Sequence, residues 1–130
     1  MTDSDLRVEL HLEVALGDTA IAVGSGDVPV LATPRLVALF EAATVRALEG
    51  RLDVAETSVG TRVEIDHLAA SPVGARVVIV AELSERDARR VVFDVRATGD
   101  DGTLLAGGRV WRAVVNRDRF LARLERTDGA

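Results

Sequence analysis

The chain has 130 residues, of which 48% are hydrophobic and 28% are charged, and its formal net charge at pH 7 is −5. This length fits a single domain over residues 1–130, and the composition excludes a disordered chain. The absence of cysteine excludes disulfides and cysteine-bound zinc, and with only two histidines in the chain we predict no metal site.

The N-terminus and the charge balance indicate where in the cell the protein is located and which classes of partner it binds. Residues Met1 to Asp5 are polar and acidic, whereas a signal peptide begins with basic residues followed by an apolar stretch. No apolar run approaches the ~20 residues that a membrane span needs. We therefore expect a cytoplasmic protein without a membrane segment. The negative net charge and the lack of a recognisable binding motif predict no nucleic-acid partner.

The first structured segments are a strand and a loop. Apolar residues alternate from Leu6 to Val14, which predicts a half-buried strand with His11 pointing to water. Residues 17–29 contain three glycines and one proline. They predict a long loop, which is a candidate lid.

One long helix is predicted from Pro34 to Glu49. Thr33 supplies an N-cap hydroxyl, proline suits the first helical position, and Gly50 ends the helix. On a helical wheel the apolar residues form one broad stripe, with Glu41 at its edge. A carboxylate beside an apolar stripe is costly unless it is paired, so Glu41 is a candidate site residue.

Residues 61–70 predict a second alternating strand. The alternation places His67 on the same face as Val63 and Ile65. Asp66 points to the opposite face and cannot orient the imidazole of its neighbour. His67 is therefore a second candidate that faces the interior.

The remainder of the chain predicts three strands, at residues 76–83, 90–98 and 103–116, and a short closing helix at 117–125. A connection at 85–88 and the turn signal Asp101-Gly102 imply antiparallel pairing. The order of a strand, a loop, a long helix and four strands predicts an α+β fold, with the long central helix wrapped by an antiparallel sheet.

Each candidate also has a purely structural explanation. Thr33 could serve only as a helix cap, Glu41 could be a surface residue, and His67 could be a core histidine whose ring nitrogens are hydrogen-bonded. Arg112 is predicted to point inward, the alternative being a surface or interface salt bridge. Four other arginines lie near predicted strand ends and either contact phosphate groups or remain solvated: Arg76, Arg86, Arg89 and Arg90.

The spacing of these residues resembles the fluoroacetyl-CoA thioesterase family of hot dog-fold proteins. That family has a threonine at the start of its central helix, a glutamate eight residues later and a histidine twenty-six residues after the glutamate, and Thr33, Glu41 and His67 hold these positions here. Gly60 matches a glycine whose N–H meets the thioester carbonyl, and Arg112 matches a basic residue. The resemblance spans residues 31–121 and implies that both contact the substrate.

The resemblance implies a single hot dog thioesterase-like domain. It would hydrolyse a small or medium acyl-CoA to the free acid and CoA, with CoA present only as part of the substrate. It also implies a homodimer with the substrate channel at the subunit interface. Residues 24–30 contain no aromatic residue where the fluoroacetyl-specific member has phenylalanines, which argues against fluoroacetyl specificity.

Two assignments of the chemistry stay open. In the first, Glu41 is the nucleophile or general base, His67 transfers protons and Thr33 orients the reacting group. In the second, Thr33 is the nucleophile, His67 its base and Glu41 the orienting carboxylate. Two other functions also compete: a non-catalytic module that binds acyl-CoA or another ligand, and an enoyl-CoA hydratase-like enzyme.

Overall fold

The computed structural model describes residues 6–128. Their order is β1 (Arg7–Glu13), η2 (Leu16–Asp18), α1 (Ala20–Val23), α2 (Thr33–Leu48), β2 (Glu56–His67), β3 (Arg76–Asp87), β4 (Arg90–Gly99), β5 (Leu104–Asn116) and α3 (Arg117–Asp128). None of the helices within these residues combines the length and the hydropathy needed to cross a membrane.

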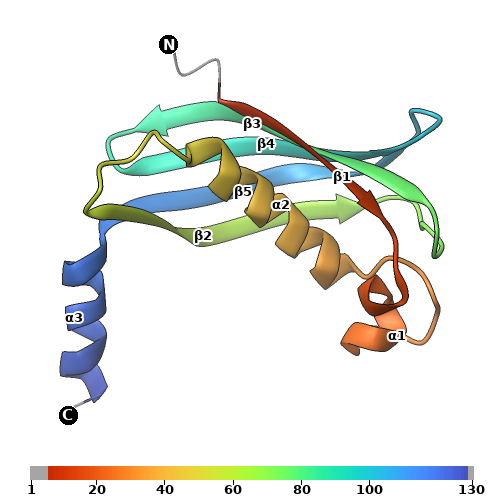
Figure 1. Cartoon of the computed structure of the whole chain (residues 1–130), viewed down its shortest axis with the longest axis horizontal. Helices are drawn as coiled ribbons and strands as arrows, with labels where there is room; N and C mark the ends of the chain where they lie inside the picture. Colours follow the sequence, from red (N-terminus) through yellow and green to blue (C-terminus); the bar gives the residue numbers. More distant parts are fainter. Residues whose placement is uncertain (1–5, 129–130) are drawn as a thin grey trace.

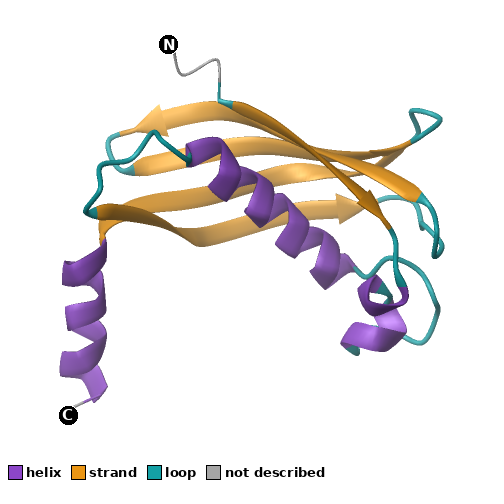
Figure 2. Cartoon of the chain, in the orientation of Figure 1, coloured by secondary structure: helices purple, strands orange, loops and turns teal. Residues whose placement is uncertain are grey.

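The five strands form one antiparallel sheet in the order β1-β3-β4-β5-β2. Strands β3, β4 and β5 are consecutive hairpins, whereas β1 and β2 are separated in sequence by α2 and lie at opposite edges (Figure 1). Figure 2 shows α2 lying across one face of the curved sheet and α3 projecting from the sheet's end. The predicted α+β architecture is confirmed.

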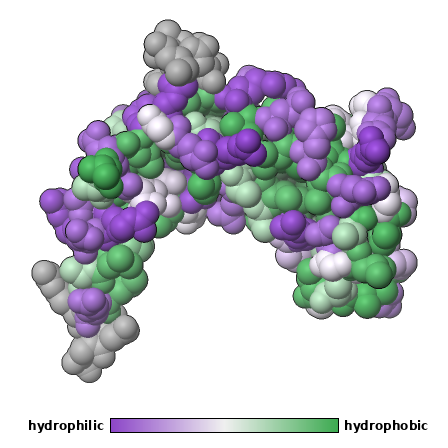
Figure 3. All heavy atoms as spheres, in the orientation of Figure 1, coloured by the Kyte–Doolittle hydropathy of each residue, from purple (hydrophilic) through white to green (hydrophobic). Residues whose placement is uncertain are grey.

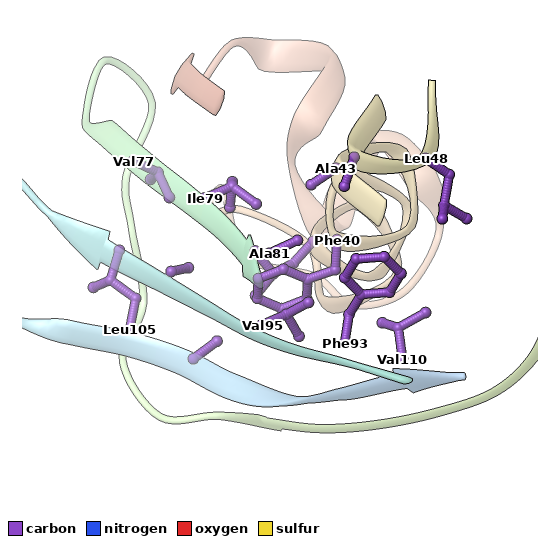
Figure 4. Packing of buried hydrophobic residues seen from close by; sticks show 14 of the residues in the cluster. Phe40, Ala43, Leu48, Val77, Ile79, Ala81, Phe93, Val95, Leu105 and Val110 are labelled. Atoms are coloured by element: carbon purple, nitrogen blue, oxygen red, sulfur yellow. The ribbon is translucent and has the colours of Figure 1, made fainter. Parts of the chain in front are cut away.

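Apolar side chains from α2 and from the inner face of the sheet form the core. Phe40 of α2 and Phe93 of β4 are both 0% exposed, and Figure 4 shows them close to Val95 and Val110. Burying one such side chain stabilises the fold by about 1.5–3 kcal/mol. The helix that carries Thr33 and Glu41 is therefore held firmly on the sheet.

The segment predicted as a long loop, residues 17–29, is partly helical, because it contains the end of η2 and all of α1. Thr19 caps α1 by accepting a hydrogen bond from the Ala22 N–H at 3.2 Å. The Asp18 carboxylate accepts hydrogen bonds from the Ala15 N–H at 2.8 Å and from Arg35 Nε at 2.7 Å. The loop prediction was wrong because a residue of α2, distant in the sequence, helps to order this segment.

Two strand boundaries also differ from the prediction. β2 begins at Glu56 and not at Thr61, and β3 runs through residue 87, so that only Ala88 and Arg89 connect it to β4. Ala88 has a φ of 54°, which lets two residues close the hairpin. Alanine rarely adopts this conformation, so the sequence carried no signal for so tight a turn.

Candidate active site

The start of α2 holds the first predicted site residue. Thr33 is the first helical residue, and Ala32 occupies the N-cap position without a side-chain hydrogen bond. The Thr33 hydroxyl is instead hydrogen-bonded to His67, with 2.8 Å between Oγ1 and Nδ1. The interpretation of Thr33 as a helix cap is therefore wrong, because the helix begins one residue earlier than predicted and the cap lies outside it.

His67 is the last residue of β2, and it shares an inward face with Val63 and Ile65, as the alternation predicted. Its Nε2 atom is buried and has no hydrogen-bond partner among the described residues. Leaving such an atom unsatisfied costs about 1–3 kcal/mol. His11, by contrast, is 69% exposed and lies 3.1 Å from a Glu9 oxygen, so it belongs to the surface, as predicted.

A cavity of ≈ 260 Å³ opens beside the Thr33–His67 pair. The two residues line it together with four alanines, two leucines, one valine and one serine. The lining contains neither an aromatic nor a charged side chain apart from the imidazole itself. Ligand pockets typically enclose about 300–1,000 Å³, so this space suits a small apolar group adjacent to the hydroxyl.

Glu41 lies in the middle of α2, where its side chain is 38% exposed. Its Oε2 atom accepts a hydrogen bond from Arg112 Nη1 at 3.4 Å. Arg112 also donates from Nε to the Ser58 hydroxyl at 2.9 Å and from Nη2 to the Ser58 carbonyl at 3.2 Å. The inward position predicted for Arg112 is confirmed, and the guanidinium connects α2 to β2.

Arg112 is buried, with 7% of its side chain exposed. Burial lowers the pKa of its guanidinium below the ordinary value, and the Glu41 carboxylate opposes this shift. Arginine starts from so high a pKa that it stays charged. A buried positive charge therefore faces the carboxylate of Glu41.

Gly60 lies directly against the same carboxylate. A Cβ atom at this position would overlap Oε2 of Glu41 and would lie 3.4 Å from Arg112 Nη1. The pairing of β2 with β5 is irregular between Gly60 and Arg62, which is the kind of bulge that redirects a backbone beside a site. Gly60, Glu41 and Arg112 thus form one cluster, which we call the carboxylate cluster, with Ser58 as its fourth member.

Sequence reasoning missed Ser58. It precedes the predicted start of the strand, and the bulge changes the phase of alternation. Counting back from His67 in steps of two residues reaches Thr61 and Val59, and so assigns Ser58 and Gly60 to the wrong face. Only the observed register places Ser58 beside Arg112.

The predicted site residues therefore form two groups in one chain. Thr33 and Glu41 are separated by eight residues on α2, which is about 12 Å at 1.5 Å per residue. The Thr33–His67 pair lies at the start of the helix, and the carboxylate cluster lies near its middle. Among residues 6–128, no group of three or more His, Asp or Glu residues is arranged to hold a metal ion.

Comparison with known proteins finds relatives over most of the chain. The family model described as fluoroacetyl-CoA-specific thioesterase matches residues 14–118. A fluoroacetyl-CoA thioesterase of Streptantibioticus cattleyicolor is 36% identical over 96 residues, which cover 73% of this chain and 68% of that protein.

Solved structures agree with these sequence matches. A structure of a fluoroacetyl-CoA thioesterase has a TM-score of 0.84 at 31% identity, over 92% of this chain and 93% of that chain. A thioesterase superfamily member from Thermus thermophilus has a TM-score of 0.87 at 26% identity, over 95% and 90% of the two chains. A hot-dog-like protein from Thermanaerovibrio acidaminovorans reaches 0.88 at 23% identity, over 100% and 99% of the two chains. The predicted hot dog fold is confirmed.

Proposed function

Since the chain belongs to the fluoroacetyl-CoA-specific thioesterase family and hydrolyses acyl-CoA thioesters, we propose that its substrate carries a small or medium acyl group, released as the free acid. CoA enters as part of the substrate and leaves as the free thiol, and the proposal includes no resident cofactor. The proposal includes a cytoplasmic location.

The observation that carries this proposal is the Thr33–His67 pair in the wall of a cavity of ≈ 260 Å³ that alanine, leucine and valine residues also line. The cavity accepts the acyl chain, and the hydroxyl lies where the thioester carbonyl enters. The curated relative is named for fluoroacetyl-CoA. The alanine-rich lining, free of aromatic residues, supports a longer acyl group than fluoroacetyl for this chain.

For the chemistry we favour Thr33 as nucleophile and His67 as its base. The Thr33 oxygen attacks the thioester carbon while His67 Nδ1 takes the hydroxyl proton. The tetrahedral intermediate collapses, the C–S bond breaks, and the imidazolium protonates the departing thiolate of CoA. Water then attacks the acyl-threonine ester with His67 again as base, which releases the acid and restores the hydroxyl.

The second nitrogen of His67 supports a role for a partner subunit. For Nδ1 to accept a proton, the neutral ring must carry its hydrogen on Nε2. That N–H needs an acceptor, and Nε2 has none among the described residues. In hydroxyl–imidazole sites a carboxylate commonly fills this position. We propose that Glu41 of the partner subunit does so in a homodimer.

The topology supports such a dimer. β2 is an edge strand, and two copies that pair along it about a two-fold axis run antiparallel. The end of β2 that carries His67 in one subunit then lies beside the first half of the partner's β2, between the start of that strand and its Gly60. The partner's carboxylate cluster lies at this position. Each site would combine Thr33 and His67 of one subunit with Glu41 and Gly60 of the other. The Gly60 N–H would donate to the oxyanion.

The other assignment, with Glu41 as nucleophile or general base, predicts different kinetics. Under the threonine mechanism, Thr33→Ala lowers kcat by about 1,000-fold or more, and Thr33→Ser retains activity because it keeps the hydroxyl. Under the carboxylate mechanism, Thr33→Ala is mild. Glu41→Gln loses most turnover under either mechanism, because the orienting carboxylate of a triad is also needed. Parallel measurement of kcat for the three variants distinguishes the two.

Thiol release across a panel of acyl-CoA substrates tests the proposed function. We expect turnover of short and medium saturated acyl groups, and little hydration of an enoyl-CoA included in the panel. His67→Ala should abolish turnover without loss of the fold, as checked by circular dichroism. Binding without thiol release, or turnover of fluoroacetyl-CoA alone, would contradict the proposal.

Mixing two inactive variants tests the shared site. A heterodimer of His67→Ala and Glu41→Gln carries both substitutions in one site and neither in the other. Random subunit exchange should therefore restore about a quarter of the wild-type activity. If each site is built from one subunit, no activity returns.

A further inference from the structure

The closing helix, α3, has little to pack against within one chain. It is 12 residues long, and none of its side chains from Arg117 to Glu125 is buried. Leu121 and Leu124 lie three residues apart on one face of the helix, and each is about half exposed. An isolated helix of this length is only marginally stable in water. A surface outside its own chain is therefore needed to hold α3 in place.

A hollow of ≈ 430 Å³ lies at the opposite end of the sheet from α3. The ends of four neighbouring strands, β2, β5, β4 and β3, meet there. Leu68 and Leu104 are each next in sequence to a residue of its lining, and they are 61% and 48% exposed. We call it the strand-end hollow, and its lining includes Ala69, Pro72, Arg76, Asp100, Asp101 and Leu105.

The strand register shows how a second chain would bring α3 to this hollow. Glu56 at the start of β2 pairs with Asn116, the residue before α3. His67 at the other end of β2 pairs with Ala106, beside the strand-end hollow. In the proposed dimer the two β2 strands run antiparallel, so the start of one lies beside the end of the other. α3 of one subunit therefore begins beside the strand-end hollow of the other.

The direction and the length of α3 fit this arrangement. A hydrogen bond of 2.9 Å from the Arg117 N–H to the Ala55 carbonyl fixes the start of the helix. Figure 1 shows α3 extending from there past the β2 edge, away from the other strands of its own sheet. Its 12 residues span about 18 Å, and four adjacent strands span about 14 Å. α3 is therefore long enough to cross the ends of the partner's β2, β5, β4 and β3.

The two surfaces are complementary in charge as well as in hydropathy. Residues 117–125 contain three arginines and two carboxylates, which gives a net charge of +1. The lining of the strand-end hollow contains one arginine and two aspartates, which gives a net charge of −1. Opposite charges favour the pairing of α3 with the hollow over the pairing of two α3 helices.

We propose that α3 of each subunit docks across the strand-end hollow of its partner, an inference that rests on the homodimer proposed above. Leu121 and Leu124 pack against Leu68 and Leu104 of the partner subunit, so that each chain covers apolar side chains of the other. Two-fold symmetry repeats this contact at both ends of the dimer.

This docking places α3 next to the partner's reaction site. The strand-end hollow shares Ala69 and Ala70 with the cavity that Thr33 and His67 line. Docked α3 lies on the outer side of this shared segment, which forms one wall of that cavity. α3 touches no reacting group, so its role is to position the wall.

Disulfide cross-linking tests the docking directly, because the chain contains no cysteine. The test variant combines Leu121→Cys with Leu104→Cys. Within one chain the 13 residues of β5 separate the two positions by about 40 Å, far beyond the ~7 Å between Cα atoms that a disulfide can bridge. Mild oxidation should therefore give a species of twice 13.8 kDa on a non-reducing gel, and reduction should reverse it.

Three controls make the cross-link specific. Leu104→Cys alone, and Leu121→Cys combined with Asp94→Cys at an exposed position in the middle of β4, should remain at the mass of one chain. Leu121→Cys alone should do the same. Efficient cross-linking of Leu121→Cys alone would show that two α3 helices pack on each other, and would overturn the docking.

Dimer affinity provides a second measurement. Leu121→Asp should raise the dimer dissociation constant about 10-fold or more in analytical sedimentation, and Leu121→Met should leave it near the wild-type value. A dimeric, active enzyme without the disulfide would overturn the docking and leave the proposed function intact. A cross-linked protein that releases no thiol would overturn the function and leave the docking intact. A monomer would overturn the dimer and the docking together.

Discussion

Glu41 is positioned by three neighbours, each through a different interaction. Gly60 offers it space, Arg112 offers it a buried positive charge, and Ser58 fixes Arg112 through two hydrogen bonds. The position of the Glu41 carboxylate is therefore sensitive to small changes at residues that do not themselves react. Two substitutions test this sensitivity.

Gly60→Ala should impair catalysis with little effect on the fold. The new methyl group would overlap Oε2 of Glu41, and a carboxylate at the end of a flexible side chain can move aside at low cost. Misplacement of this group should lower kcat by about 10–100-fold. Steady-state kinetics measure the fall in kcat, and thermal denaturation measures the stability. The control is Gly107→Ala, where a Cβ lies at an ordinary 3.6 Å from the Val95 carbonyl.

Ser58→Ala should affect both stability and rate. It removes the acceptor for Arg112 Nε, and a buried charged donor without an acceptor costs about 1–3 kcal/mol. Arg112 then holds Glu41 less firmly, so kcat should fall. Ser58→Thr keeps the hydroxyl and should restore most of both. Denaturant unfolding measures the stability, and steady-state kinetics measure kcat. If Ser58→Ala matches the wild type in both, Ser58 does not hold Arg112 in place.

At the scale of elements, the segment from η2 to α1 depends on a charge pair that links it to α2. Asp18 is buried, with 12% of its side chain exposed, and lies 2.7 Å from Arg35 Nε. Burial alone would raise the pKa of Asp18, but hydrogen bonds from Ala15 and Arg35 and the charge of Arg35 hold it below the usual value. Ala20 and Val30 line the cavity beside Thr33 and His67. The Asp18–Arg35 pair therefore supports one wall of that cavity.

The stabilisation from Asp18 should depend on pH. A folded-state pKa below the unfolded value stabilises the protein above the unfolded pKa of about 3.9, and this stabilisation is lost as the pH falls through the folded-state value. Asp18→Asn should therefore cost about 1–2 kcal/mol at pH 7 and progressively less as the pH falls through the folded-state pKa of Asp18. Unfolding curves at several pH values measure this. Asp27→Asn, at an exposed position of the same segment, is the matched control.

At the scale of the whole molecule, apolar side chains are exposed in a single chain both on α3 and around α1, at the two ends of the structure. Figure 3 shows two projecting ends separated by a hollow, with hydrophobic surface visible on each. Leu121 and Leu124 of α3 are 47% and 50% exposed, and Ile21 of α1 and Val28 are 54% and 51% exposed. Antiparallel pairing of two β2 edges would bring α3 of one copy towards α1 of the other, which supports the proposed homodimer.

Assembly should be visible in solution and in the kinetics. Sedimentation should give twice the 13.8 kDa of one chain. Because each site needs two subunits in the proposal, specific activity should fall when the enzyme is diluted below the dimer dissociation constant. A monomer of full specific activity at low concentration would exclude the shared site.

Local sequence patterns were sufficient for most elements of this protein. Period-two alternation identified two of the strands and placed His67 inward, and the helical stripe placed Glu41 at its edge, because side-chain direction follows directly from backbone period. Apolar runs between turn signals identified the other three strands. The α+β class followed from the order of elements. The spacing of Thr33, Glu41 and His67 then led to the thioesterase family, which the comparisons confirm.

Only the tertiary structure decided how the site residues are grouped. The bulge at Gly60 shifts the phase of β2, the helix starts at Thr33 and frees its hydroxyl, and Arg112 binds Ser58 as well as Glu41. Each of these contacts joins residues that are distant in sequence. Their geometry depends on the register between strands and on how the helix lies across the sheet, and no local pattern encodes either.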